Sequence, residues 1–276
     1  MPELPEVETV RCGLAPVLEG RVLARVVLRR QNLRFPFPEG FGQILTGNTV
    51  SRVERRAKFL LLMMDDDSVL IAHLGMSGSF RIYTSDPPDL DPHDHVIFLT
   101  SDGVEIRYND PRRFGFMDIC PVAELADYPM LKKLGPEPVH PGISGNVLSE
   151  RLSGKATPIK SALLDQRIIA GIGNIYACEA LFSAGVSPRR KAGTIKGKRA
   201  DTLAHAIDDV LTVAIKAGGS SLRDHRQPNG ELGYFQHNFQ VYGRAGEPCL
   251  RCGDPVMIKK LVQSGRTTFY CSRCQR

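Results

Sequence analysis

Four cysteines near the C-terminal end constrain the fold of this chain more than any other feature. They form two Cys-x2-Cys pairs, Cys249/Cys252 and Cys271/Cys274, with 18 residues between the pairs. Each pair can turn two thiolates onto one tetrahedral ion, and this spacing is typical of a four-cysteine zinc site. Because four thiolates leave no open coordination position, the sequence predicts one structural Zn²⁺ rather than a catalytic or redox centre.

The segment between the cysteine pairs is expected to fold as a β-hairpin. Val256–Val262 and Thr267–Tyr270 read as strands on either side of a turn, with Arg266 at the tip. Zinc alone does not specify a nucleic-acid ligand. A basic tip with two further lysines, Lys259 and Lys260, nearby favours one.

Composition narrows the class of protein. The 276 residues are enough for two domains, and a hydrophobic content of 42% is that of an ordinary soluble chain. No stretch approaches the ~20 apolar residues of a membrane span, and no basic, then apolar signal opens the chain, so a cytoplasmic protein is expected. The net charge of +6 permits a polyanionic partner. Seven cysteines, an odd number, argue against a disulfide framework.

The first half of the chain is rich in strand signals. Apolar residues recur at helical spacing from Pro5 to Leu18, and strand-like runs separated by turn residues follow. These runs are Arg21–Arg29, Thr49–Arg55, Phe59–Met64, Ser68–His73, Gly78–Tyr83, Val96–Thr100 and Val104–Tyr108. Many short strands predict a sandwich or barrel with the first helix packed on it.

The second half is helical. A Gly- and Pro-rich stretch around Leu134–Ser144 reads as a linker. Helices are then expected at Gly145–Ser153, Pro158–Asp165, Ile175–Ala184 and Arg199–Ala217, followed by a polar loop over Gly218–Gly233. The predicted fold class is α+β, with a sandwich or barrel domain at 1–134, a linker at 135–150, a helical domain at 151–239 and the finger at 240–276.

Pro2 and Glu3 suit chemistry as well as structure. Removal of the initiator methionine would leave Pro2 with a free secondary amine, which can add to an aldehyde carbon and form an iminium ion. An α-amino group titrates near ~8 and lysine near ~10.4, so more of the terminus is unprotonated at neutral pH. Glu3 can donate or accept a proton. A plain helix start is the alternative, because Pro5 suits a first turn and glutamates suit the positive end of the helix dipole.

Asp165–Tyr176 contains a glycine-rich turn. A helix is expected to end near Ala170, and Asn174 is placed to cap the next helix. The free N–H groups of that helix could hold a phosphate. A simple helix–helix connection is the alternative.

Two other turns carry side chains of kinds that enter a DNA duplex. Met76 lies in His73–Gly78, and Arg112 and Phe114 lie in Asp110–Gly115. Methionine and phenylalanine can wedge between base steps, and arginine can read base edges. Core packing remains the alternative for Met76 and Phe114.

Lys58 and His93 are also ambiguous. Lys58 precedes an apolar strand and is either a solvated strand end or a phosphate contact. His93 and His95 flank Asp94, a spacing that could serve one metal. With no further ligand nearby, a phosphate contact or a surface pair is favoured.

These segments together resemble bacterial formamidopyrimidine-DNA glycosylases. The resemblance rests on Met1–Thr9, His73–Gly78, Asp110–Gly115, Gly171–Ala177 and the four-cysteine finger, in the family's order from end to end. It implies an enzyme that excises 8-oxoguanine and formamidopyrimidines from duplex DNA and then cleaves the abasic site by β,δ-elimination. It also implies an N-terminal β-sandwich with flanking helices, a helix–two-turn–helix domain and a zinc finger, with DNA bound between the two lobes.

The resemblance also implies a role for each matching residue. Pro2 would attack C1′ of the damaged nucleotide, and Glu3 would move protons at the sugar. Lys58 would contact phosphate and assist catalysis, and Arg266 would bind phosphate and donate a proton in the later elimination. The DNA-contacting positions would be Met76, His93, Arg112, Phe114, Lys155 and Asn174, and Met76, Arg112 and Phe114 would fill the gap left by the flipped base. The Gly218–Gly233 loop would close over that base.

The expected partner is damaged double-stranded DNA, with no membrane involved, and a monomer in the bacterial cytoplasm, associated with the nucleoid through DNA, is expected. The nearest alternative is the related endonuclease VIII branch, which acts on oxidised pyrimidines. That branch typically reads Pro-Glu-Gly-Pro-Glu where this chain has Pro2-Glu3-Leu4-Pro5-Glu6. A non-catalytic zinc module that binds damaged DNA and an RNA-binding zinc protein are alternatives from other classes.

Overall fold

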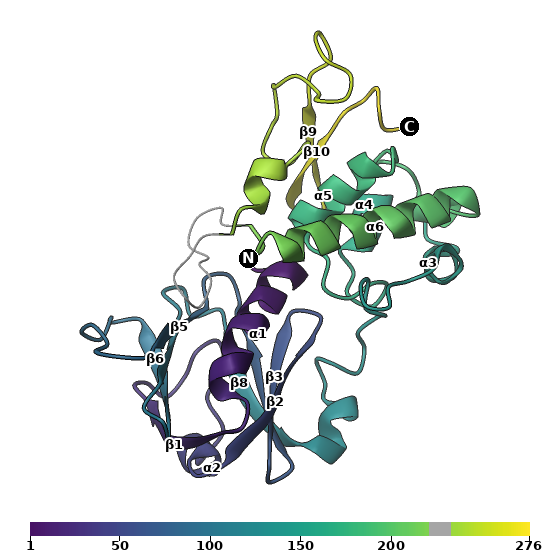
Figure 1. Ribbon diagram of the computed structural model, residues 1–276. Helices are drawn as coiled ribbons and strands as arrows, with labels where there is room; N and C mark the ends of the chain where they lie inside the picture. The colour runs from purple at the N-terminus through teal and green to yellow at the C-terminus, as the bar shows by residue number, and fades with distance from the viewer. Residues whose placement is uncertain (221–232) are drawn as a thin grey trace. The chain divides into compact units, whose positions relative to one another are not determined.

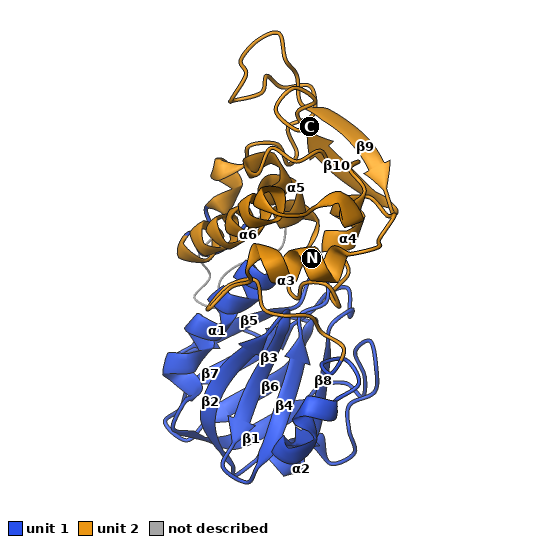
Figure 2. Cartoon of the chain, turned by 90° about the vertical axis from the view of Figure 1, so that its right-hand side faces the viewer, with its two compact units in different colours: residues 1–132, 217–234 blue, residues 133–216, 235–276 orange. Residues whose placement is uncertain are grey.

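The computed structural model describes residues 1–220 and 233–276, and the chain divides into the two units coloured in Figure 2. One comprises Met1–Lys132 and Ala217–Tyr234. The other comprises Lys133–Lys216 and Phe235–Arg276, so the later helices and the finger belong to one unit.

The first unit begins with α1 (Leu4–Leu18), which Figure 1 shows running alongside the strands. Its start is fixed locally, because the Glu3 N–H donates to Glu6 Oε2 at 2.8 Å and Pro5 lies in the first turn. The helix expected from Pro5 to Leu18 is therefore confirmed to within one residue.

Eight antiparallel strands follow in the order β5-β7-β6-β1-β2-β3-β4-β8. Their bounds are β1 (Arg21–Leu28), β2 (Thr49–Arg56), β3 (Phe59–Met64), β4 (Ser68–His73), β5 (Ser79–Tyr83), β6 (Asp94–Thr100), β7 (Glu105–Asn109) and β8 (Phe116–Pro121). β1 joins both halves of this order: Arg21 and Val22 pair with β2, and after a register shift the rest of β1 pairs with β6. One strand thus passes from one layer of the sandwich to the other.

The core of this unit lies between α1 and the strands. The apolar face of the helix and the inward-facing apolar side chains of the strands pack together there. The buried residues include Val7, Val10, Leu14, Leu60, Leu62, Leu70, Phe80, Val96, Phe98 and Tyr108. β3 is buried along its whole length, as expected for a strand covered on both faces.

Three elements of this unit were not expected from the sequence. They are α2 (Phe41–Leu45), the edge strand β8 and the short 3₁₀ helix η1 (Val122–Asp127). β8 pairs with β4 directly after the Asp110–Gly115 turn. The other predicted strands are present with shifts of one or two residues at their ends.

The second unit contains the four expected helices and the finger hairpin. Its elements are α3 (Gly145–Leu152), α4 (Ile159–Leu163), α5 (Asn174–Ser183), η2 (Ala192–Thr194), α6 (Lys198–Lys216), η3 (Phe235–Asn238), β9 (Lys259–Gln263) and β10 (Arg266–Tyr270). The α+β fold class, with a helical part and a β-hairpin finger, is confirmed.

Two local predictions in this unit were wrong. The helix expected to end near Ala170 ends at Leu163, and turns occupy the residues up to Gly173. Gly173, not Asn174, is the N-cap of α5, because its extended backbone precedes the first helical residue.

The finger hairpin closes over Ser264 and Gly265, with Gln263 and Arg266 as its last pair.

Within residues 1–220 and 233–276, no helix combines the length and the apolar character needed to cross a bilayer.

Candidate active site and DNA-contacting residues

The N-terminal end of α1 gathers three buried candidate groups. Pro2 is buried, and the side chains of Glu3 and Glu6 are 3% and 2% exposed, whereas Met1 is 48% exposed. Taking a carboxylate out of water is unfavourable unless it is hydrogen-bonded or paired. Two buried carboxyl groups at the start of one helix are therefore candidates for functional residues.

Glu6 also holds the beginning of the Gly218–Gly233 loop. The N–H and Oγ of Ser220 donate to Glu6 Oε1 at 2.8 and 3.0 Å. Gly219 has a φ of +74°, and a Cβ there would come within 3.0 Å of the same oxygen, so only glycine fits easily. Residues 221–232, where most of the predicted base-covering loop falls, lie outside the described residues.

Lys58 lies in the tight turn between β2 and β3, where Arg56 pairs with Phe59 and Ala57 has a φ of +55°. Its side chain is only 7% exposed. The alternative that Lys58 is a solvated strand end is therefore wrong. A buried amine beside other charges is suited to an anion or to proton transfer.

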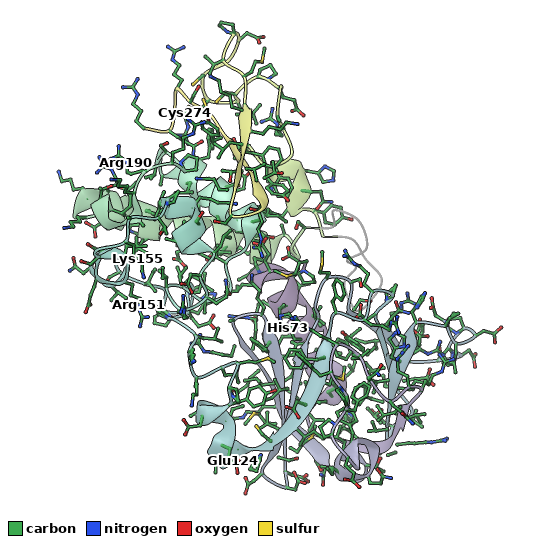
Figure 3. All side chains as sticks on the ribbon, turned by 180° about the vertical axis from the view of Figure 1, so that it is seen from behind. His73, Glu124, Arg151, Lys155, Arg190 and Cys274 are labelled. Carbon is green, nitrogen blue, oxygen red and sulfur yellow. The ribbon has the colours of Figure 1, made fainter. Side chains whose placement is uncertain are left out.

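His73, labelled in Figure 3, lies on the neighbouring strand β4 opposite Phe59. Burial, with the positive charges of Lys58 and Arg34, lowers the pKa of His73 to about 4. Its imidazole stacks on Phe116 with ring centroids 5.6 Å apart. Sequence reasoning did not select His73, although it opens the His73–Gly78 segment. Its pairing with Phe59, the residue after Lys58, across the adjacent strands β3 and β4 is the signal that could have identified it.

A polar chain connects α1 to the turn that carries Lys58. Glu8 Oε2 accepts from Arg55 Nε at 2.8 Å, and Arg55 Nη1 donates to the Ala57 carbonyl at 3.0 Å. The hydrogen bonds from Arg11 and Arg55 lower the pKa of Glu8 in spite of its burial, which acts in the opposite direction. The first unit thus fixes the start of its helix relative to the Lys58 turn.

The three predicted duplex-filling side chains protrude from their turns. Met76 is 39% exposed and Phe114 44% exposed, and Arg112 is exposed as well. The Arg112 guanidinium lies 5.0 Å from the Phe114 ring centroid, so the two side chains form a cation–π pair. Core packing, the alternative considered for Met76 and Phe114, is therefore wrong.

Asp110 joins the two turns that carry these side chains. It is fully buried, and its carboxylate accepts from Ser77 Oγ at 2.6 Å and from the Gly115 N–H at 2.8 Å. The Arg112 N–H in turn donates to Ser77 Oγ at 3.2 Å. A Cβ on Gly75 would lie 2.3 Å from the Phe114 backbone, so the turns touch where glycine alone fits.

His93 is exposed at the end of a loop held by a buried ion pair. The carboxylate of Asp94 accepts from Asn109 Nδ2 at 2.8 Å and from Arg107 Nη1 at 3.4 Å. Asp94 is therefore committed to protein partners and does not support the metal site considered for His93 and His95. The exposed imidazole of His93 is free to meet a ligand from solvent.

In the second unit, Asn174 lies at the centre of a small polar cluster. Its Oδ1 accepts from Lys160 Nζ, and its Nδ2 donates to the Thr267 carbonyl at 2.9 Å. The structure thereby brings Asn174 next to Arg266, which precedes Thr267 at the exposed tip of the hairpin. Lys160 is fully buried and was missed from the sequence.

Lys155 is half-buried in the connection between α3 and α4. Its carbonyl accepts from the Gly193 N–H at 2.9 Å, which places it beside the segment after α5. It does not join the Asn174 cluster through any hydrogen bond seen among the described residues.

Glu179 anchors the finger to α5. Its carboxylate accepts from the backbone N–H groups of Gln240, Val241 and Tyr242 at 2.8 to 3.0 Å. Burial raises the pKa of Glu179, although the three hydrogen bonds act to lower it. A buried carboxylate thus sets where the finger, with Arg266, begins.

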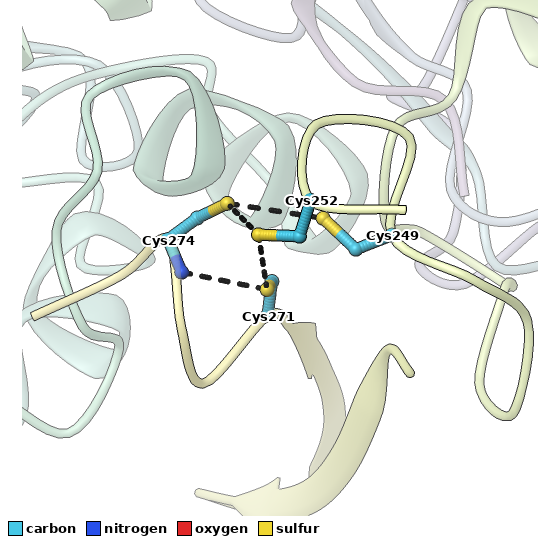
Figure 4. Close-up of side chains that lie close together, drawn as sticks. All are labelled: Cys249, Cys252, Cys271 and Cys274. Atoms are coloured by element: carbon cyan, nitrogen blue, oxygen red, sulfur yellow. Dashed lines mark hydrogen bonds between the residues drawn. The ribbon is translucent and has the colours of Figure 1, made fainter. Parts of the chain in front are cut away.

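The four cysteines converge as the sequence predicted (Figure 4). Their sulfur atoms all lie within 4.8 Å of one another, with Cys249–Cys274 at 3.8 Å, Cys252–Cys271 at 3.9 Å and Cys252–Cys274 at 3.0 Å. Zn–S bonds of about 2.3 Å in a tetrahedron place sulfurs about 3.8 Å apart, which the first two pairs match. Four convergent thiols therefore form a donor set that suits one Zn²⁺. No other group of three or more such ligands occurs in the described part of the chain.

Comparison with known proteins agrees with this arrangement. Residues 1–117 match the family model of the formamidopyrimidine-DNA glycosylase N-terminal domain, and residues 134–226 match its H2TH domain. Residues 246–276 match the zinc finger found in FPG and IleRS. The formamidopyrimidine-DNA glycosylase of Rhodospirillum centenum is 56% identical, with 100% of both chains covered.

The chain belongs to the formamidopyrimidine-DNA glycosylase family. Among solved structures, a Lactococcus lactis FPG mutant in complex with Fapy-dG DNA is 36% identical, with a TM-score of 0.90 and 100% of both chains covered. The wild-type Lactococcus lactis protein in complex with oxidised-pyrimidine DNA is also 36% identical, with a TM-score of 0.89 over 100% of both chains.

Family membership settles several predictions. The resemblance, the fold class and the prediction of a DNA-repair glycosylase with a four-cysteine zinc finger are confirmed. As a formamidopyrimidine-DNA glycosylase, the protein is an enzyme, and its finger is suited to one structural zinc ion. Zinc there would fix the hairpin that carries Arg266 without taking part in the reaction.

Proposed function

We propose that this protein removes oxidised purines, 8-oxoguanine and formamidopyrimidines, from duplex DNA and then cleaves the strand at the abasic site. The observation that carries the proposal is the buried start of α1, where Pro2 and Glu3 precede a helix fixed by Glu6. Family membership over the full chain supports it.

The chemistry needs a free amine, so Met1 must be removed first. The Pro2 nitrogen then attacks C1′, the glycosidic electrons leave with the base, and the sugar ring opens as Glu3 moves a proton to its oxygen. The resulting iminium ion withdraws electrons and makes the C2′ protons acidic. Loss of one such proton expels the 3′-phosphate, a second elimination expels the 5′-phosphate, and water releases Pro2. A one-nucleoside gap remains, with no net oxidation or reduction.

The remaining site residues hold and bend the DNA in this proposal. Lys58 and Arg266 contact phosphates, and Arg266 also donates a proton in the later elimination. Extrusion of a base costs a few kcal/mol, which Met76 and Phe114 offset by filling the gap. Arg112, which offers only donors, suits the acceptors on the pairing edge of the orphaned cytosine better than adenine.

His93, Lys155 and Asn174 complete the proposed DNA contacts. We also propose that the protein acts as a monomer on nucleoid DNA. The division into domains 1–134, 151–239 and 240–276, with a linker at 135–150, is retained as part of this proposal.

Product analysis on a duplex with one 8-oxoguanine opposite cytosine tests this function. We expect release of the free base together with strand products that end in phosphate on both sides of the gap. Release of the base without strand cleavage would overturn the lyase step, and binding without either product would favour a non-catalytic damaged-DNA binder.

Oxidised pyrimidines are a second candidate substrate class. The Lactococcus lactis protein was solved with oxidised-pyrimidine DNA, which favours testing it here. Excision from matched duplexes with an oxidised pyrimidine or 8-oxoguanine separates the two, and faster excision of the pyrimidine would favour an endonuclease VIII-like preference. Comparable affinity for undamaged RNA would favour an RNA-binding protein instead.

A further inference from the structure

Residues 189–199, here called the basic strip, carry a charge that the proposed site does not use. Six of these eleven residues are basic and none is acidic: Arg189, Arg190, Lys191, Lys196, Lys198 and Arg199. The remaining 30 basic residues of the chain balance its 30 acidic ones, so the net charge of +6 equals that of the strip. All six side chains are exposed except Arg190, which is half-buried.

Five of the six cations of the strip are not neutralised by the fold. Arg190 Nε donates to an oxygen of the terminal residue, Arg276, at 3.4 Å. Across residues 1–220 and 233–276, no ion pair joins any of the other five cations to a side-chain carboxylate. Concentrated charge of one sign is unfavourable for a compact structure through self-repulsion. A partner that brings negative charge would relieve it.

The backbone of the strip is fixed next to Lys155. Lys191 and Pro158 form an isolated antiparallel β-bridge. The Ala192 N–H donates to the Thr157 carbonyl at 2.9 Å, and the Gly193 N–H donates to the Lys155 carbonyl at 2.9 Å. Figure 3, in which Arg190 and Lys155 are labelled, shows both on the same side of the second unit. The strip therefore extends a surface that already carries a proposed DNA contact.

The composition of the strip indicates which polyanion fits. It contains no aromatic residue, so it offers no platform on which unpaired bases could stack. Lysine is a compact charge that binds phosphate without fixed geometry, and half of the six cations are lysines. This chemistry suits the regularly spaced phosphates of a duplex and reads no sequence.

We propose that the basic strip, together with Lys155, is a second DNA-binding surface that holds undamaged duplex through its phosphates. It rests on the proposed function, because its use is to keep the enzyme on DNA while it searches for a lesion. Sequence-independent phosphate contacts allow a protein to slide along a duplex.

The test compares two triple variants with equal loss of charge. The strip variant carries Lys191→Gln, Lys196→Gln and Lys198→Gln, and the control carries Arg21→Gln, Arg25→Gln and Arg52→Gln on β1 and β2, all at exposed positions. Affinity for a long undamaged duplex is measured across salt concentrations from about 50 to about 200 mM. The negative slope of log affinity against log salt should become less steep by about 2.7 in the strip variant, which is about 0.9 for each lost contact. The control should keep the wild-type slope.

An unchanged slope in the strip variant overturns the proposal, and so does an equal change in the control, which would reflect net charge alone. Loss of binding to RNA with the DNA slope preserved also overturns it. Excision of 8-oxoguanine by an excess of wild-type enzyme is measured in parallel. Absence of excision would contradict the proposed function while leaving the salt slopes to judge the strip.

Discussion

The candidate catalytic groups of the first unit are buried, whereas Arg266, the candidate phosphate contact on the finger of the second unit, is exposed. Glu3 and Glu6 are almost inaccessible at the start of α1. Arg266 is exposed at a hairpin tip whose position depends on a metal site and on Glu179. The first unit therefore buries the groups proposed to begin the reaction, and the second presents positive charge to solvent.

This difference separates the expected effects of substitution. Changes in the buried cluster of the first unit should alter the rate of the chemical steps at nearly constant affinity, because they do not touch the bulk of the DNA. Changes in the second unit should alter affinity and its salt dependence. Four substitutions test whether the two units differ in this way.

Glu3→Gln should have the largest effect. It keeps the size of the side chain but removes its proton transfer, which is worth roughly 10²- to 10⁴-fold in rate. Single-turnover excision of 8-oxoguanine should fall within that range while the dissociation constant for damaged duplex stays unchanged. A large loss of affinity with normal excision at saturation would mean that Glu3 serves binding.

Cys249→Ser should act on affinity instead. With one thiolate replaced, the finger should lose zinc and no longer fix the hairpin that carries Arg266. We expect sub-stoichiometric zinc by elemental analysis and at least about 10-fold weaker binding of damaged duplex, since about 1.4 kcal/mol changes an affinity tenfold. A zinc-free variant that binds with full affinity would contradict the role given to the second unit. Cys12→Ser, at an exposed cysteine outside the cluster, is the matched control.

Arg112→Ala should change selectivity more than rate. A good arginine–base contact contributes about 1–3 kcal/mol of discrimination, so the ratio of excision opposite cytosine to excision opposite adenine should fall by about 5- to 150-fold. The neighbouring Arg113→Ala provides the control. An unaltered ratio would show that the opposite base is read elsewhere.

His73→Gln should have the smallest effect, on pH-dependent stability. The pKa of His73 is held at about 4 in the folded chain, whereas an unfolded histidine titrates near ~6.5. As pH falls between these values the unfolded chain takes up a proton first, so this contribution to stability is lost. Urea unfolding at about pH 7 and about pH 5 should show a smaller loss in the variant than in the wild type. An equal loss would mean that His73 is charged in the folded protein.

Local chemistry explains what the sequence could predict. The zinc finger follows from cysteine spacing because four ligands and one ion determine each other. The start of α1 follows from Pro5 and Glu6, which act within one helical turn. Exposed Met76 and Phe114 were foreseeable because their turns are rich in glycine and polar residues.

The missed features depend on partners that are distant in sequence. Lys160 lies in an apolar run, and its partner Asn174 is brought near by the glycine-rich turn. His73 gains its importance from Lys58, which lies in the turn before the neighbouring strand β3. β8 has no alternating apolar pattern in its sequence and is stabilised by pairing with β4. A short stretch of sequence does not reveal such a pairing.

The central claim is that the free amine of Pro2 attacks the damaged nucleotide. Borohydride trapping on 8-oxoguanine duplex, followed by protease digestion and mass spectrometry of the adduct, tests it most directly. We expect the DNA remnant on an N-terminal peptide that begins at Pro2 and lacks Met1, and a sharply reduced adduct yield in Pro2→Gly with binding intact. An adduct on a lysine such as Lys58, or full trapping by protein that retains Met1, would contradict the claim.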